Sequence, residues 1–307
     1  MKPEPGNPVT VVGAGIAGAA CAVALRSAGV PVRVIERGRA PGGRLASPLL
    51  HGRRVDLGAG YFTVRDPGFA AVVEDWAARG LARPWTDSFG VLTADQPAGI
   101  STGPIRWATP DGLRSLVRDL LTGIEVLTGT ELTEPPAGRL VLAMPDPQAG
   151  RLCTVPDPVP CSATITVGCG YPERDWPAGD GWFVNDHPVL EFVADDGARR
   201  GDGRPVLVAH TTPTLAARCL DRPDEAIEPV LAALTELLGA GQPSWTHAHR
   251  WRWAKPAGQH RSTFGFGRLP DGRQVGLAGD QWCPDGAPRV ESAWRSGTDL
   301  GSALAGG

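Results

Sequence analysis

The chain has 307 residues and a mass of 32.1 kDa, with 30 basic and 33 acidic side chains and a formal net charge of −3. A chain of this length buries about three quarters of its unfolded surface, which suits one large domain or two interleaved domains. The near-neutral charge argues against a nucleic-acid-binding protein, which needs a basic face, and 42% hydrophobic with 21% charged residues argue against a disordered chain.

The cysteine pattern indicates neither a metal site nor a disulfide framework. Six cysteines include no Cys-x-x-Cys pair, and no histidine stands at zinc spacing from them. The only apolar run that resembles a signal peptide or membrane span, residues 9–25, contains several glycines and follows Glu4 instead of a positive cluster. We therefore expect a soluble cytoplasmic protein with reduced thiols and no membrane partner.

The first predicted elements form one nucleotide-binding unit. Residues 9–12 predict a buried parallel strand, residues 19–27 a helix, and residues 32–35 a second strand that ends at Glu36. The loop between the first strand and the helix is a glycine-rich run made of Gly13, Ala14, Gly15, Ile16, Ala17 and Gly18.

The residue type at each of these positions has a structural reason. Gly13 permits a tight turn, Gly15 lets the backbone approach a pyrophosphate, and Gly18 lets the helix pack closely on the strand. The amino terminus of the helix, which follows Ile16 and Ala17, offers free N–H groups to phosphates. Glu36, which lies 18 residues past Gly18, can accept hydrogen bonds from a ribose diol. The unit predicts a dinucleotide site but does not distinguish NAD from FAD.

Two further segments favour FAD. After Glu36 come Arg37 and the turn Pro41-Gly42-Gly43-Arg44, from which a guanidinium can reach a pyrophosphate. The small residues Gly58, Ala59 and Gly60 allow backbone to lie against a flat ring.

The carboxy-terminal part supplies a partner for these segments. Residues 275–280 predict a buried strand that ends in Gly279 and Asp280, and an aspartate there can bind ribityl hydroxyls. Pro288 then opens a helix that starts with Arg289 and Val290 and whose positive end would face the flavin pyrimidine. An NAD site needs no such element.

The middle of the chain predicts a second, sheet-based domain. Helices are expected over residues 66–80, 110–121 and 224–238, and strands over residues 139–144, 163–167, 189–193 and 206–210. We expect an α/β protein in which a Rossmann-like FAD-binding domain (1–65, 102–150 and 263–307) is interleaved with a smaller α+β substrate domain on a mixed or antiparallel sheet (66–101 and 151–262).

Residues 245–253 alternate with period two, so that their tryptophans and histidines share one face of a strand. One interpretation is a strand that buries these rings against helices. The other is an aromatic floor that runs toward the flavin and ends near Trp253 and Lys255. Lysine occurs only twice in the chain, at Lys2 and Lys255.

Together these motifs resemble the flavin-binding signatures of the renalase family, over nearly the whole chain. The residues that carry the resemblance are Gly13 to Glu36, Gly42-Gly43-Arg44, residues 56–62, Gly279-Asp280 and residues 288–291, with looser matches at residues 66–80 and 251–254. Renalases are FAD proteins similar in fold to monoamine oxidases and p-hydroxybenzoate hydroxylase. The cofactor contacts expected from the motifs and the resemblance are Gly13, Gly15, Ile16, Ala17, Gly18, Glu36, Arg37, Gly43, Arg44, Gly58, Ala59, Gly60, Leu132, Gly279, Asp280, Arg289 and Val290.

The resemblance implies oxidation of a small organic molecule by hydride transfer to the flavin, with O2 as the expected acceptor. Bacterial renalases oxidise misreduced dihydropyridine isomers of NAD(P)H, and related enzymes dehydrogenate C–N or C–C bonds. Lys255 is the expected catalytic lysine, with Trp253 and Tyr61 as pocket walls. Alternatives are a tailoring amine or C–C oxidase and a flavoprotein without net redox chemistry.

Two departures from the family pattern fall on the substrate side. Gly60 stands where a larger polar residue is expected, and residues 198–201 replace a Lys-Pro-Gly-Arg-like turn. They indicate a different substrate, bulkier or less polar.

Overall fold

The first sheet is built from segments near both ends of the chain. The computed structural model describes residues 8–93 and 96–306, and within them this sheet has the strand order β14-β15-β8-β1-β2-β7. All neighbouring strands are parallel except β14 and β15. Its strands are β1 (Val9–Val12), β2 (Val32–Glu36), β7 (Glu125–Thr128), β8 (Leu140–Ala143), β14 (Gly265–Arg268) and β15 (Gln274–Ala278).

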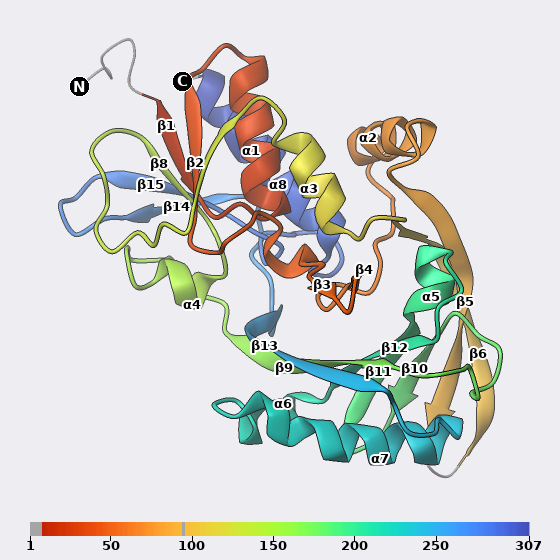
Figure 1. Ribbon diagram of the computed structural model, residues 1–307. Helices are drawn as coiled ribbons and strands as arrows, with labels where there is room; N and C mark the ends of the chain where they lie inside the picture. Colours follow the sequence, from red (N-terminus) through yellow and green to blue (C-terminus); the bar gives the residue numbers. More distant parts are fainter. Residues whose placement is uncertain (1–7, 94–95, 307) are drawn as a thin grey trace.

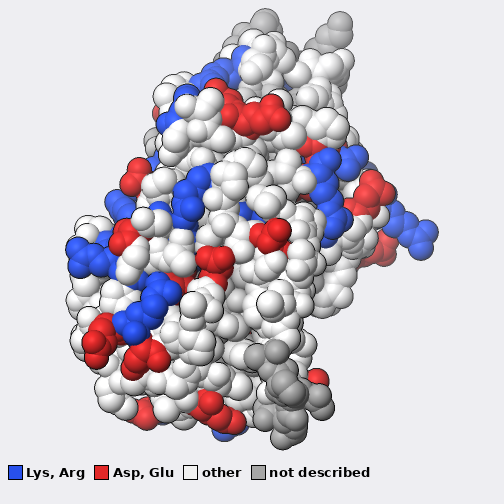
Figure 2. All heavy atoms as spheres, turned by 90° about the vertical axis from the view of Figure 1, so that its right-hand side faces the viewer, with Lys and Arg blue, Asp and Glu red and all other residues white. Residues whose placement is uncertain are grey.

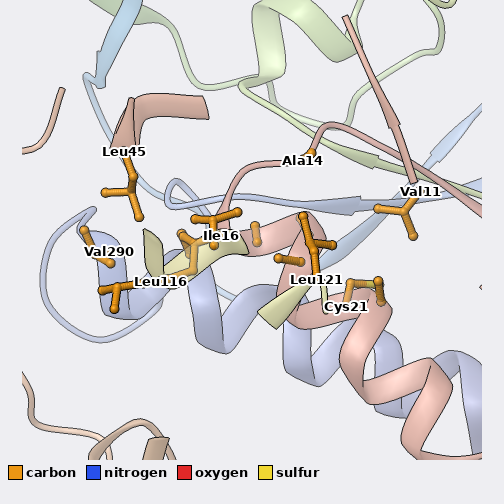
Figure 3. Packing of buried hydrophobic residues seen from close by; sticks show 14 of the residues in the cluster. Val11, Ala14, Ile16, Cys21, Leu45, Leu116, Leu121 and Val290 are labelled. Atoms are coloured by element: carbon orange, nitrogen blue, oxygen red, sulfur yellow. The ribbon is translucent and has the colours of Figure 1, made fainter. Parts of the chain in front are cut away.

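Helices from both ends of the chain pack together against this sheet (Figure 1). They are α1 (Ile16–Ser27) and α8 (Val290–Gly306), and residues of α2 (Pro67–Ala78) and α3 (Arg114–Leu120) join the same buried cluster. A Cβ added at Gly297 of α8 would lie 1.9 Å from the Ala17 carbonyl oxygen, so only glycine lets α8 approach the α1 backbone this closely. Ile16, Leu45, Leu116 and Val290 belong to the same buried cluster, where the starts of α1, α3 and α8 converge (Figure 3).

Within residues 8–93 and 96–306 the second sheet has seven strands in the order β13-β9-β12-β11-β10-β5-β6, and β10 and β5 are its only parallel neighbours. Its strands are β5 (Arg83–Thr93), β6 (Gln96–Ala108), β9 (Cys161–Gly170), β10 (Gly181–Asn185), β11 (Leu190–Asp195), β12 (Val206–Thr211) and β13 (Trp245–Pro256). Helices α6 (Pro213–Arg218) and α7 (Ile227–Leu238) cover one face, and the other face is turned toward the first domain (Figure 1).

Short elements connect these parts. They are the hairpin β3 (Leu49–Leu50) and β4 (Arg53–Arg54), the helices α4 (Asp146–Ala149) and α5 (Asp196–Arg200), and the 3-10 helices η1 (Gly43–Leu45) and η2 (Pro223–Ala226). None of the helices within the described ranges has both the length and the apolar character that crossing a bilayer requires.

The expected fold class, a Rossmann-like α/β domain with a second sheet-based domain, is confirmed. The expected boundary between residues 101 and 102 is wrong, because it cuts β6, whose Arg106 and Ala108 pair with β5 in the second sheet. Helix α2 packs through Phe69, Val73 and Trp76 into the core of the first domain, not the second.

Two helix starts also differ from the expectation. α3 begins at Arg114, because residues 110–113 form a turn whose Leu113 N–H donates to buried Asp56. α8 begins at Val290, so Pro288 precedes the helix and does not lie within its first turn.

Candidate functional site

The glycine-rich loop after β1 has the backbone geometry of a phosphate cradle. Gly13 has a φ of +105°, and a Cβ added there would lie 2.4 Å from the Ala143 carbonyl oxygen. A Cβ at Gly18 would lie 1.9 Å from the Gly13 carbonyl oxygen, so both positions require glycine for close packing. Gly15 is different, because its added Cβ would meet nothing within 4 Å. The space beside Gly15, at the amino end of α1, is therefore open to a ligand.

Glu36 lies at the end of β2 beside this loop. Its Oε2 accepts a hydrogen bond from the Ala14 N–H at 2.8 Å, and its Oε1 accepts one from the Gly38 N–H at 2.6 Å. These bonds hold the carboxylate in place and leave lone pairs on both oxygens for a diol. Ile16 and Ala17, the first residues of α1, are buried in the core. Gly15 and Glu36 fit the phosphates and the ribose of a dinucleotide.

The cofactor contacts expected of Arg37 and Leu132 stay predictions. Arg37 is exposed and stands 3.7 Å from Glu131 in a surface ion pair. Leu132 is partly buried and packs against the apolar cluster that contains Leu140 and Leu142 of β8. The structure gives neither residue a polar contact to the loop.

Arg44 connects three distant segments. Its guanidinium donates to Asp280 through two bonds, Nη1 to Oδ2 at 2.9 Å and Nη2 to Oδ1 at 2.6 Å, and Nη1 also donates to the Ala254 carbonyl at 3.1 Å. Gly43 lies directly against Gly15, since its added Cβ would be 3.2 Å from the Gly15 Cα. The turn that follows β2 and the end of β15 thus meet beside the glycine-rich loop.

The segment of small residues after β4 packs against the same turn. Ala59 N–H donates to the Arg44 carbonyl at 2.9 Å, and a Cβ added at Gly58 would lie 1.9 Å from that oxygen. Gly60 has similarly little room, because its added Cβ would lie 2.7 Å from the Phe192 ring. Gly58 and Gly60 therefore let this segment fit between the Arg44 turn and the second sheet.

The carboxy-terminal contact forms where β15 leads to α8. Gly279 N–H donates to the Ser296 hydroxyl at 3.0 Å, and the Ser292 hydroxyl donates to the Asp280 carbonyl at 3.3 Å. Val290 is buried in the first core, whereas Arg289 lines a cavity of about 400 Å³ with Trp282 and Cys283. The start of α8 is thus fixed beside Asp280.

The face of the second sheet that is turned toward the first domain is largely aromatic. Phe89, Phe183 and Phe192 come from β5, β10 and β11, and Tyr61 joins them with its ring centroid 5.3 Å from that of Phe89. On β13, the Trp251 indole N–H donates to the Leu57 carbonyl at 2.7 Å. We call the set Tyr61, Phe89, Phe183 and Phe192 the aromatic chamber.

This arrangement decides between the two interpretations of residues 245–253. Trp245 packs with Val55 and Leu57 of the first domain, and Trp251 also contacts Leu57, whereas Ala248 packs with the core under α6 and α7. The rings of Trp245 and Trp251 therefore face the first domain and are not buried against the helices.

Trp253 and Lys255 follow an irregularity in β13. The register between β13 and β9 shifts between Trp251 and Lys255, which ends the strict alternation before Trp253. The Trp253 ring lies 4.9 Å from the Arg151 guanidinium carbon, and Lys255 forms a half-exposed ion pair with Glu191 of β11. Lys255 is thus a paired cation on the second sheet.

A buried ionic network near the site was not expected from the sequence. Asp196 of α5 binds Arg53 and Arg199, and Asp56 accepts from Arg200 at 3.0 Å. Burial favours neutral Asp196, but Arg199, Arg200 and Arg53 outweigh it and lower its pKa to about 2. Charged residues at these positions carry no helical or strand periodicity, so no sequence pattern indicated their pairing.

Gly60 and residues 198–201, the two places where the sequence departs from the renalase pattern, contact each other in this network. Arg199, which lies within residues 198–201, donates from Nη1 to the Gly60 carbonyl at 2.9 Å and from Nη2 to the Asp56 carbonyl at 3.1 Å. Arg199 is 1% exposed, so it fixes the backbone beside Tyr61 from within the protein.

Two histidines of the second sheet are held neutral. Burial, together with the positive charges of Lys255 and Arg199, lowers the pKa of His210 to about 3. Burial, with His247 and nearby arginines, lowers the pKa of His249 to about 4. His210 lies against the Phe192 ring with centroids 5.4 Å apart. Among the described residues no group of three or more His, Cys, Asp or Glu side chains forms a metal site.

Comparisons with known proteins agree with this fold. Residues 11–76 match the family model of an NAD(P)-binding Rossmann-like domain. The fold is similar to that of putrescine oxidase bound to putrescine, with 15% identity, a TM-score of 0.73, and 97% of this chain and 98% of that chain covered.

Two further solved structures share the fold. A protein described as a protoporphyrinogen oxidase from Exiguobacterium sp. 255-15 has 14% identity and a TM-score of 0.76, with 98% of this chain and 99% of that chain covered. Cyclohexylamine oxidase from Brevibacterium oxydans IH-35A has 15% identity and a TM-score of 0.74, with the same coverage. The amino-terminal match and these similarities establish the Rossmann-like fold of the chain.

Proposed function

We propose that this chain is an FAD-dependent oxidoreductase that oxidises a small organic molecule by hydride transfer. The observation that carries the proposal is the joining of Arg44 and Asp280 beside the open space at Gly15, because an NAD site needs no such carboxy-terminal element. Putrescine oxidase and cyclohexylamine oxidase, which share the fold, are oxidases by name.

In this proposal the residues of the chain hold and orient the cofactor. Glu36 accepts the adenosine ribose hydroxyls, the N–H groups at Gly15 and Ile16 bind the pyrophosphate, and Asp280 accepts a ribityl hydroxyl. Bound FAD supplies the acceptor for two electrons and one proton, taken together as a hydride. The positive amino end of α8 favours the negative charge that reduction adds.

The second sheet forms the substrate side. The aromatic chamber and Trp251 exclude water from the reacting atoms and offer flat apolar walls. Lys255, paired with Glu191, keeps a positive charge at this side of the molecule and can hold a water molecule at Nζ. Neutral His210 adds no second charge there.

The finer parts of the proposal are the renalase-like specificity, reoxidation by O2 and a cytoplasmic location. A dihydropyridine isomer of NAD(P)H is the first substrate to test, and an amine is the second, since two proteins that share the fold are named as amine oxidases. The charged side chains on the face in Figure 2 are of both signs and interspersed, a mixture without the single-sign field that attracts a polyanion.

The test is anaerobic stopped-flow mixing of the purified protein with candidate reductants. We expect a yellow protein that releases FAD on denaturation and whose flavin absorbance bleaches with a dihydropyridine isomer or an amine. Air should then restore the colour and produce hydrogen peroxide. A colourless protein without FAD would refute the proposal, and bound FAD that no reductant bleaches would favour the non-redox alternative.

A further inference from the structure

Arg106 is a buried cation without an anion. It lies on β6, only 5% of its surface is exposed, and its Nη1 is buried without a hydrogen-bond partner. Within the part of the chain that the structure describes, its guanidinium forms no ion pair with a carboxylate. Burying an unpaired charge is unfavourable, so such a group calls for a specific explanation.

The other buried arginines near it are all paired. Arg199 binds Asp196, and Arg200 binds both Asp56 and Asp196. Each of these two buried arginines thus has a carboxylate beside it. Arg106 differs from them in lacking this partner, although it is buried to a similar degree.

The surroundings of Arg106 are the rings of the aromatic chamber. Its guanidinium carbon lies 4.1 Å from the centroid of Phe89, 5.5 Å from that of Tyr61 and 5.8 Å from that of Phe183. Ring faces stabilise a cation electrostatically, but they accept no conventional in-plane hydrogen bonds from its N–H groups. The donors of Arg106 therefore remain available for a planar anion.

The chamber adjoins the candidate cofactor site. Tyr61 follows Gly60 directly in the sequence, and Gly58 and Ala59 pack on the Arg44 turn. Tyr61 and Phe183 are both partly exposed, so a ligand can reach their rings. Tyr61 thus connects the rings around Arg106 to the segment that lies beside the candidate cofactor site.

We infer that Arg106 binds the carboxylate of an apolar or aromatic organic acid, whose body lies on the rings of the chamber. A guanidinium matches a carboxylate through two parallel N–H···O bonds, and the dry surroundings strengthen that pairing. The inference rests on the proposed function in taking this acid to be the substrate. The inference adds a carboxylate to the expected substrate. The departures at Gly60 and at residues 198–201, taken alone, indicate a less polar substrate.

The test compares benzoate with benzamide, which has nearly the same shape but no charge. Binding to the purified protein is measured by isothermal titration calorimetry at low ionic strength. We expect benzoate to bind about tenfold more tightly than benzamide, which corresponds to one strong charge-assisted contact. Equal affinities of the wild-type protein for the two probes would overturn the inference whether or not any variant folds.

Variants of Arg106 test whether this residue causes the preference for benzoate over benzamide. Arg106→Met keeps a similar stem without the charge and should remove the preference for benzoate, with benzamide affinity little changed. Arg106→Lys keeps the charge without the planar fork and should retain part of the preference. Arg118→Met, which removes an exposed arginine of α3, is the matched control and should bind benzoate as the wild type does. The site would be refuted if Arg118→Met lost the preference for benzoate over benzamide. It would also be refuted if a folded Arg106→Met kept that preference.

This experiment separates the site from the proposed function, because FAD content is read independently from the visible spectrum. A colourless protein that still prefers benzoate through Arg106 would retain the site and refute the cofactor assignment. A yellow protein without the preference would refute the site alone.

Discussion

Arg44 and Asp280 are 236 residues apart in the sequence, and they form a two-bond ion pair with donor–acceptor distances of 2.9 and 2.6 Å. The pair joins the turn after β2 to the end of β15. Its side chains are 28% and 13% exposed, so solvent weakens the attraction without removing it. The two ends of the chain therefore close on each other through a polar contact as well as through the packing of α1 on α8.

A double-mutant cycle should measure this closure. We expect Arg44→Met and Asp280→Asn each to lower the free energy of unfolding, with a coupling energy of about 1 kcal/mol in urea denaturation. Both variants should also retain less FAD after gel filtration. The exposed i,i+4 pair of Arg79 and Asp75 is the control and should show a smaller coupling energy than Arg44 and Asp280. Full additivity of the Arg44 and Asp280 effects would contradict a direct interaction in solution.

Gly15 and Gly18 should respond differently to the same substitution. Gly15→Val places its side chain in open space, so the protein should fold normally but lose FAD affinity by about tenfold or more. Gly18→Val should lower the thermal melting temperature, because its Cβ would collide with the Gly13 carbonyl. FAD fluorescence titration and thermal melts separate the two effects. Gly306→Ala, at an open position of α8, is the control and should leave the FAD affinity and the melting temperature unchanged. Unchanged FAD affinity in Gly15→Val would contradict the proposal that the glycine-rich loop binds phosphates.

The Asp196 network should make the protein sensitive to acid in a defined range. The folded-state pKa of Asp196 is lowered to about 2 from 3.8, so its stabilisation is complete above about pH 4 and is lost as the pH falls toward 2. Arg53→Met removes one cation, raises this folded-state pKa, and should cost about 1–3 kcal/mol at neutral pH. Its acid-unfolding midpoint, followed by circular dichroism, should lie at higher pH than that of the wild type. Arg37→Met, which breaks an exposed pair, should keep the wild-type midpoint.

His210 should make the free energy of unfolding depend on pH over a higher range than Asp196 does. Its folded-state pKa is lowered to about 3 from 6.5, so the unfolded chain takes up a proton first and stability falls as the pH drops from about 6.5 toward 3. One such group contributes a slope of at most about 1.4 kcal/mol per pH unit. His210→Gln should flatten the dependence of unfolding free energy on pH between 6 and 4, and exposed His51→Gln should not. A slope unchanged by His210→Gln would mean that the pKa of His210 is not lowered in the folded protein.

Local backbone requirements made the first domain predictable from the sequence. Gly13 and Gly18 are glycine because a Cβ would collide with neighbouring carbonyl oxygens, and such requirements leave a fixed spacing in the sequence. The strand from residue 9 to 12 and the helix of α1 follow from short-range patterns for the same reason. The apolar stripe of α2 predicts a helix but does not state which surface the helix covers, so the expectation that α2 belongs to the second domain is wrong.

Strands β5 and β6 left no clear pattern, since proline, glycine and polar residues interrupt both of them. The two strands pair with each other, and β5 also pairs with β10, so that Arg106 of β6 lies among the rings of Phe89 and Phe183. Arg106 was consequently missed, along with the network around Asp196.

By itself the sequence determined the nucleotide loop, the small residues at Gly58 to Gly60, and the strand that ends at Asp280. In each of these a local backbone geometry restricts which residue can stand at which position. Only the tertiary structure decided that Arg44 meets Asp280, that Trp251 faces the first domain, and that Arg106 is paired with no carboxylate of the described residues. Pairing of charges and contacts between rings depend on which distant segments fold together, and residue spacing along the chain does not encode that.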